Sequence, residues 1–239
     1  MKLLKKMVIK PFQKALGAFG YVLEKRKNLE DFYLHEYSSY EEYKRVQIYH
    51  NKRKINSIWA DVATLNRVGQ IVSRKFNSKP IKGLCHGTRN GYEQNYLSNL
   101  DLGIDAIGTD ISETAQNYEK SITWDFHDPK PEWKGMFDFI YTNSLDQSWK
   151  PKRAIEVWLD QLNMDGVLII EHTEAHGPRE ASKMDPFGVR PTVFPYILTM
   201  WFGSQISISH SVAKKGNNNI DAWLFVVHKN VTDVRSLGD

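Results

Sequence analysis

The fold is decided by Lys82-Gly83-Leu84-Cys85-His86-Gly87-Thr88-Arg89-Asn90-Gly91, a stretch typical of a short strand that enters a glycine-bearing turn and a helix. A second strand is expected at residues 105–110, and it ends on Asp110, nineteen residues after Gly91. Glycines let a backbone pass close to a ligand, and an acid at the end of the next strand can accept hydrogen bonds from a ribose. The stretch therefore predicts a nucleotide pocket, although Arg89 stands where such turns usually carry a middle glycine.

Strand and helix patterns alternate from Pro80 onward. Strands are expected at 81–85, 105–110, 121–124, 137–142 and 167–171, and helices at 92–100, 112–118 and 152–162. Residues 163–166 are expected to end the last of these helices in a turn. A helix at 192–202 and a hairpin of strands 205–213 and 222–229 complete the pattern. The sequence therefore predicts an α/β fold: a Rossmann-like, seven-stranded, mostly parallel sheet closed by a C-terminal antiparallel hairpin.

The N-terminal third of the chain has a different character. Residues 1–79 contain 17 Lys/Arg and 7 Asp/Glu, a net charge of +10, whereas the remainder has a net charge of −6. Residues 54–76 have apolar side chains at helical spacing, and Ile58 and Trp59 are expected to pack on the sheet. We expect a basic helical extension over 1–79 that caps the pocket, a main domain over 80–230 and a tail over 231–239.

Composition restricts the classes of protein that remain. The chain has 239 residues, of which 41% are hydrophobic and 25% charged, as in globular proteins with a real core. Cys85 is the single cysteine, so an internal disulfide and a multi-cysteine metal site are excluded. No run approaches the roughly 20 apolar residues of a membrane span. We expect a cytoplasmic protein.

Over residues 80–230 the chain resembles the class I S-adenosylmethionine-dependent methyltransferases. In that family an acid ends the first strand, a Gly-x-Gly-x-Gly turn follows, and a second acid binds the ribose hydroxyls; here Cys85 replaces the first acid and Arg89 the middle glycine. The resemblance implies S-adenosylmethionine as cofactor, with Asp110 at the ribose and Asp125 near the adenine amino group. The cofactor-binding residues that it implies are Cys85, His86, Gly87, Arg89, Gly91, Asp110, Ile111, Asp125, Phe126, Asn143 and Ser144. Arg89 either binds the carboxylate of the cofactor's amino acid or turns to solvent.

The acceptor of the methyl group is less well defined. Asn143-Ser144-Leu145-Asp146 is not the family's Asn/Asp-Pro-Pro-Tyr/Phe signature of amino-group methylation, and its absence favours a small-molecule, glycan or other oxygen-type acceptor. The candidate bases are Asp146, His172, Glu174 and His176, and we expect His172, Asp146 and His176 to be catalytic. His172, Glu174 and His176 could instead bind a divalent metal, but we expect none. The long loop 177–190 is expected to be a substrate lid.

Two other functions stay open at this point. An RNA-directed methyltransferase could hold phosphates with its basic residues 1–79. A non-catalytic binding protein could have kept the fold and lost the turn, as Cys85 and Arg89 would suggest.

Overall fold

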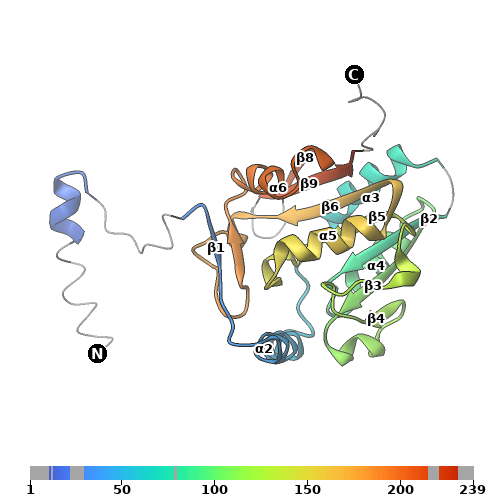
Figure 1. The fold of residues 1–239 in the computed structure, drawn as a ribbon, viewed down its shortest axis with the longest axis horizontal. Coiled ribbons are helices and arrows are strands. Elements are labelled where there is room, and N and C mark those ends of the chain that lie inside the picture. Colours follow the sequence, from blue (N-terminus) through green and yellow to red (C-terminus); the bar gives the residue numbers. More distant parts are fainter. Residues whose placement is uncertain (1–10, 12, 22–29, 78–79, 215–220, 231–239) are drawn as a thin grey trace, which may run out of the picture.

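A computed structural model describes residues 11, 13–21, 30–77, 80–214 and 221–230 of the chain. Figure 1 shows a central sheet with helices on both faces. Described residues 13–18 are helical, and the α-helices that follow are α2 (Tyr40–Arg53), α3 (Val62–Lys75), α4 (Tyr92–Ser98), α5 (Pro151–Gln161) and α6 (Phe194–Phe202). The strands are β1 (Phe32–Leu34), β2 (Ile81–His86), β3 (Ile104–Asp110), β4 (Ser121–Thr123), β5 (Phe137–Thr142), β6 (Leu162–His172), β7 (Phe187–Val189), β8 (Ile206–Lys214) and β9 (Asp221–Lys229).

The main sheet has seven strands in the order β4-β3-β2-β5-β6-β9-β8. The first five are parallel neighbours, whereas β9 pairs antiparallel with both β6 and β8. The predicted fold class, including the antiparallel C-terminal hairpin, is confirmed. The order reverses at β2, which lies between β3 and β5, and ligands of open α/β sheets bind at such a switch point.

The sheet is buried on both faces. Along β6, Leu168 and Ile170 belong to one core cluster with α5 and α6, whereas Val167 and Ile169 belong to a second cluster with α3 and α4. This alternation follows from the period of two in a strand, and burial on both sides explains the continuous apolar run that the sequence has there.

The helix predicted over 54–76 is shorter than expected. Helix α3 begins at Val62, because the Asp61 side chain accepts a hydrogen bond from the Thr64 N–H (2.8 Å) and caps the helix there. Residues 54–61 therefore form a connection, in which Ile58 and Trp59 are 53% and 38% exposed. The prediction that these two side chains pack on the sheet is wrong.

Helix α3 packs against the sheet, with Leu65, Val68 and Val72 in the same core cluster as strand residues. Helix α2 lies apart from both helical layers, at the lower end of the sheet in Figure 1. The domain boundary at residue 79 stays a prediction.

Three further local predictions are corrected. Residues 163–166 belong to β6, whose pairing with β5 is irregular between Phe137 and Phe139, so this segment is part of a strand and not a turn. The helix expected over 112–118 is present as a 3₁₀ helix, Glu113–Asn117, and not as an α-helix. The loop 177–190 contains β7, which pairs antiparallel with β1, from Phe32 opposite Val189 to Leu34 opposite Phe187. With three residues each, β1 and β7 offer little periodicity from which to predict them.

Candidate functional site

Two adjoining cavities lie where β2, β3 and β5 end, which is the switch point of the sheet. We name them the α2 cavity, lined by residues of α2 together with Asp110 and Asp125, and the open cavity, lined by Trp59, Glu93, Asn143, Asp146 and His176. Five residues line both, so the two cavities form one continuous site: Lys54, Gly87, Arg89, Gln147 and Asp185. The open cavity measures ≈ 630 Å³ and the α2 cavity only ≈ 30 Å³.

The turn after β2 has the backbone that a glycine-rich turn requires. Gly87 and Gly91 have φ angles of 73° and 75°, and a Cβ at Gly87 would lie 2.5 Å from the Ser144 Cβ. Arg89 has a φ of 46°, in the left-handed region that favours glycine. The turn therefore keeps its shape although its middle residue carries a side chain. Arg89 Nη1 donates a hydrogen bond to the Ser57 carbonyl (3.0 Å) and lines both cavities.

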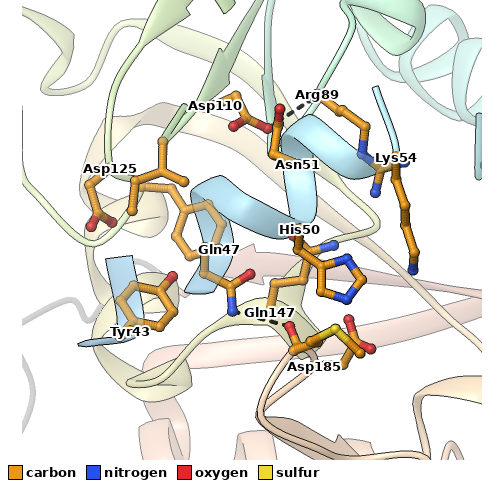
Figure 2. A pocket seen from close by; sticks show the side chains of 14 residues that line it. Tyr43, Gln47, His50, Asn51, Lys54, Arg89, Asp110, Asp125, Gln147 and Asp185 are labelled. Carbon is orange, nitrogen blue, oxygen red and sulfur yellow. Dashed lines mark hydrogen bonds between the residues drawn. The ribbon is translucent and has the colours of Figure 1, made fainter. Parts of the chain in front are cut away.

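Asp110 ends β3 and faces this turn (Figure 2). Its Oδ2 accepts a hydrogen bond from the Arg89 N–H (3.0 Å), and its Oδ1 accepts one from the Ser112 N–H (2.9 Å). Burial raises the pKa of this carboxyl, although the two backbone hydrogen bonds oppose the shift. A carboxylate has about four lone-pair sites. The two backbone donors use one site on each oxygen, and the Asn51 side chain is a further donor to this carboxylate, which lines the α2 cavity.

Asp125 and Phe126 line the same cavity beyond Asp110. Asp125 Oδ1 accepts hydrogen bonds from His127, and Oδ2 accepts one from the Tyr40 hydroxyl (2.8 Å). Burial alone would raise the pKa of Asp125, but the hydrogen bonds from His127 hold it below its usual value. This end of the site combines a charged acceptor with an aromatic ring.

Helix α2 closes the cavity with a buried polar face. Tyr43, Gln47, His50 and Asn51 line the cavity: Asn51 lies beside Asp110, whereas Gln47 points to the segment of Asp185, where its Nε2 donates a hydrogen bond to the Met184 carbonyl (3.1 Å; Figure 2). Their positions i, i+4, i+7 and i+8 put them on one side of a helix. Helix α2 therefore lies over this cavity, whereas α3 packs on the sheet, and the assignment of residues 1–79 as a cap stays a prediction. The four side chains of α2 were not predicted as part of the site. The polar residues at helical spacing were the signal that could have identified them.

The open cavity contains a carboxyl beside an imidazole. His176 Nε2 lies 3.8 Å from Asp146 Oδ2, and the Trp59 ring is 5.2 Å from the His176 ring. Burial raises the pKa of Asp146 well above its usual value, and Asp146 Oδ1 has no hydrogen-bond partner among the described residues. Asn143 and Ser144 line the same cavity, and Ser144 Oγ donates a hydrogen bond to the Gly87 carbonyl (3.1 Å).

Three residues predicted for the site have side chains that point elsewhere. Cys85 is fully buried in the apolar cluster under α3 and α4, and burial raises the pKa of its thiol well above the usual value. Both ring nitrogens of His86 are hydrogen-bonded, to Thr109 Oγ1 (2.8 Å) and Gln161 Oε1 (3.0 Å). We correct the predicted side-chain contacts of Cys85 and His86 with a cofactor, because both residues lie in β2 with side chains directed into the two helical layers.

His172 is corrected in the same way. Its Nε2 is hydrogen-bonded to the Val189 carbonyl (2.8 Å), its ring stacks on Phe194, and burial lowers its pKa to about 4. It does not line either cavity, so it cannot reach an acceptor as a base. Nor does it join Glu174 and His176 in a metal site: in the described ranges, no group of three His, Cys, Asp or Glu side chains is arranged to hold a metal ion.

No family model matches the sequence, and no curated protein matches it. Among solved structures, it is similar to a 1,6-didemethyltoxoflavin-N1-methyltransferase of Burkholderia thailandensis with bound S-adenosylhomocysteine, at 13% identity and a TM-score of 0.63, over 82% of this chain and 92% of that one. The plantazolicin methyltransferase BpumL, in complex with S-adenosylhomocysteine, is 15% identical with a TM-score of 0.56, over 80% and 96% of the two chains.

The chain therefore has the fold of the class I S-adenosylmethionine-dependent methyltransferases. A third similar structure, the [4+2]-cyclase SpnF, has a TM-score of 0.54 at 13% identity, over 78% of this chain and 93% of that one. This similarity extends to a protein that is named for a cyclisation. The fold alone therefore does not define the reaction, which has to be inferred from the residues of the site. None of the helices in the described ranges combines the length and apolar character that a membrane span needs.

Proposed function

We propose that this chain is an S-adenosylmethionine-dependent methyltransferase that methylates an oxygen of a small-molecule or glycan acceptor. The observation that carries the proposal is Asp110, a buried carboxylate 8% exposed, aimed from the end of β3 at a left-handed turn. Two ribose hydroxyls would give this carboxylate the hydrogen bonds that its remaining lone pairs can accept.

The residues along the site match the successive parts of the cofactor. Asp110 would hold the ribose, and Asp125, Phe126 and Ile111 the adenine, all of them in the α2 cavity. The methionine arm would pass Gly87 and Asn143 into the open cavity. A cavity of ≈ 30 Å³ has room for about one water. Binding of a nucleoside therefore requires α2 or its side chains to move outward.

The bound cofactor would supply a methyl group carried on a positive sulfonium. His176 is the side chain placed to take the proton from an acceptor hydroxyl, because it lines the open cavity and imidazole is the side-chain group that most often acts as a general base. Asp146 Oδ2, 3.8 Å from His176 Nε2, would orient the ring and stabilise its charged form after a small approach. His172 is not part of this proposal.

The walls of the open cavity support an uncharged acceptor better than RNA. Two basic residues, Lys54 and Arg89, line it together with five acidic ones: Glu93, Asp146, Glu174, Glu180 and Asp185. This excess of carboxyl groups would repel phosphates. The partly exposed Trp59 offers an aromatic face to the ring of a sugar or small molecule.

Titration calorimetry with S-adenosylhomocysteine tests the proposal. We expect one saturable site per chain, and no binding of NAD, whose pyrophosphate would meet the acidic wall. A folded protein that binds no S-adenosylhomocysteine would contradict the proposal and favour a binding protein with another ligand. Retention of RNA that falls steeply with salt would favour the RNA-directed alternative.

Replacement of Arg89 by glycine tests the predicted contact with the cofactor's carboxylate. We expect the affinity for S-adenosylhomocysteine to fall about tenfold or more, because a charge-assisted hydrogen bond is lost. The free energy of unfolding should change little, since the relief of a positive φ offsets the lost bond to Ser57. Calorimetry and thermal unfolding measure the two quantities. An unchanged affinity would mean that Arg89 stays bound to Ser57.

A further inference from the structure

The end of β2 offers no charge to a cofactor. Cys85 holds the position of the family's first acid, but its thiol is fully buried among apolar side chains and its pKa is raised by that burial. A neutral thiol under a helix cannot pair with a cation. Any acid that serves the methionine arm must come from another element of the site.

One carboxyl group in the open cavity is buried, and only one of its two oxygens has a hydrogen-bond partner among the described residues. Glu93, on α4 two residues after Gly91, is 6% exposed. Its Oε1 accepts a hydrogen bond from Asn143 Nδ2 (3.1 Å), and its Oε2 has no partner among the described residues. Leaving such an oxygen buried and unpaired costs free energy, and the cost is larger when the group is charged. Burial accordingly raises the pKa of Glu93 to about 7.

The position of Glu93 identifies the kind of group that would satisfy it. It lines the open cavity with Gly87 and Asn143, where the methionine arm would run. That arm carries two positive centres, a sulfonium and an α-ammonium. Only the ammonium has N–H donors that can complete the hydrogen bonding of Oε2. Arg89 lines the same cavity, so Glu93 and Arg89 together could pair with the ammonium and the carboxylate of an amino acid.

We infer that the Glu93 carboxylate binds the α-ammonium group of the cofactor's methionine arm and replaces the acid that is missing at Cys85. This inference rests on the proposed function. Asn143 holds Oε1 of Glu93 and leaves Oε2 for the ligand. The signal in the sequence was an acid directly after the turn of a motif whose usual acid is absent.

The test compares two ligands on two proteins. Glu93→Gln keeps the shape and removes the charge, and 5′-methylthioadenosine has the nucleoside of S-adenosylhomocysteine without its amino acid. We expect the variant to bind S-adenosylhomocysteine about tenfold or more weakly and 5′-methylthioadenosine within about twofold of the wild type. Glu119→Gln, an exposed change of the same type, is the matched control and should leave both affinities unchanged.

Unchanged binding of S-adenosylhomocysteine by Glu93→Gln, or an equal loss for both ligands, would overturn the inference. If the variant does not fold, the wild type decides: an S-adenosylhomocysteine analogue without the α-amino group should bind about tenfold or more weakly, and equal affinity would overturn the inference. Failure of the proposed function gives a different result, because the wild type would then bind neither S-adenosylhomocysteine nor 5′-methylthioadenosine.

Discussion

Replacement of Asp110 by asparagine is expected to weaken the binding of S-adenosylhomocysteine by about 100-fold, or about 3 kcal/mol. The carboxylate accepts hydrogen bonds from the Arg89 and Ser112 N–H groups and would accept two more from the ribose hydroxyls. The asparagine side chain has only one acceptor oxygen. Its NH₂ group would therefore lie against one of the N–H or O–H donors that the carboxylate accepts from. Charge-assisted hydrogen bonds are also about twice as strong as neutral ones.

Calorimetry measures this loss, and 5′-methylthioadenosine should show the same loss because it carries the same ribose. Asp105→Asn is the matched control: Asp105 lies on the same strand and pairs with Lys120 at the surface. An exposed pair contributes little to stability, so this variant should bind as the wild type does. If Asp110→Asn binds both ligands normally, the nucleoside does not lie at the end of β3.

Replacement of His176 by alanine is expected to lower the rate of methyl transfer by about 10² to 10³, because general-base catalysis contributes an effect of this size. The affinity for S-adenosylhomocysteine should stay within about twofold, since His176 lies in the open cavity away from the α2 cavity that would hold the nucleoside. Asp146→Asn should lower the rate less if Asp146 acts by orienting the ring.

Transfer of labelled methyl from S-adenosylmethionine into the glycan and small-molecule fractions of a cell extract measures this rate before the acceptor is identified. His210→Ala, a change at an exposed histidine on β8, is the control and should have the wild-type rate. A His176→Ala variant with full activity would contradict the assignment of the base. Loss of both rate and cofactor affinity would show that His176 supports the site structurally.

Local pattern was sufficient for the main sheet because each of its strands carries its own signal. Alternating apolar strands and amphipathic helices after Pro80 determine a parallel sheet, and the two strands after residue 205 determine its antiparallel end. The spacing of Gly87, Gly91 and Asp110 also predicted that the turn and the acid at the end of β3 lie together, as the hydrogen bond from the Arg89 N–H to Asp110 shows. Parallel strands bring their carboxyl ends to one edge, so these residues had to meet.

Side-chain direction at the same edge was decided by the tertiary structure. Strand β2 stays paired through His86 and β6 through His172, so Cys85, His86 and His172 point into the helical layers and not out of the sheet. The length of a strand depends on its partners, and a shift of one residue at its end changes the face that a side chain occupies.

The sequence by itself determined the α/β sheet, the turn and the acid at Asp110, because these follow from short-range periodicity and spacing. Only the tertiary structure decided which polar groups meet in the cavities: the buried face of α2, the approach of His176 to Asp146, and the unpaired oxygen of Glu93. Such contacts join residues far apart in the chain, and their energies depend on burial, which no local pattern specifies.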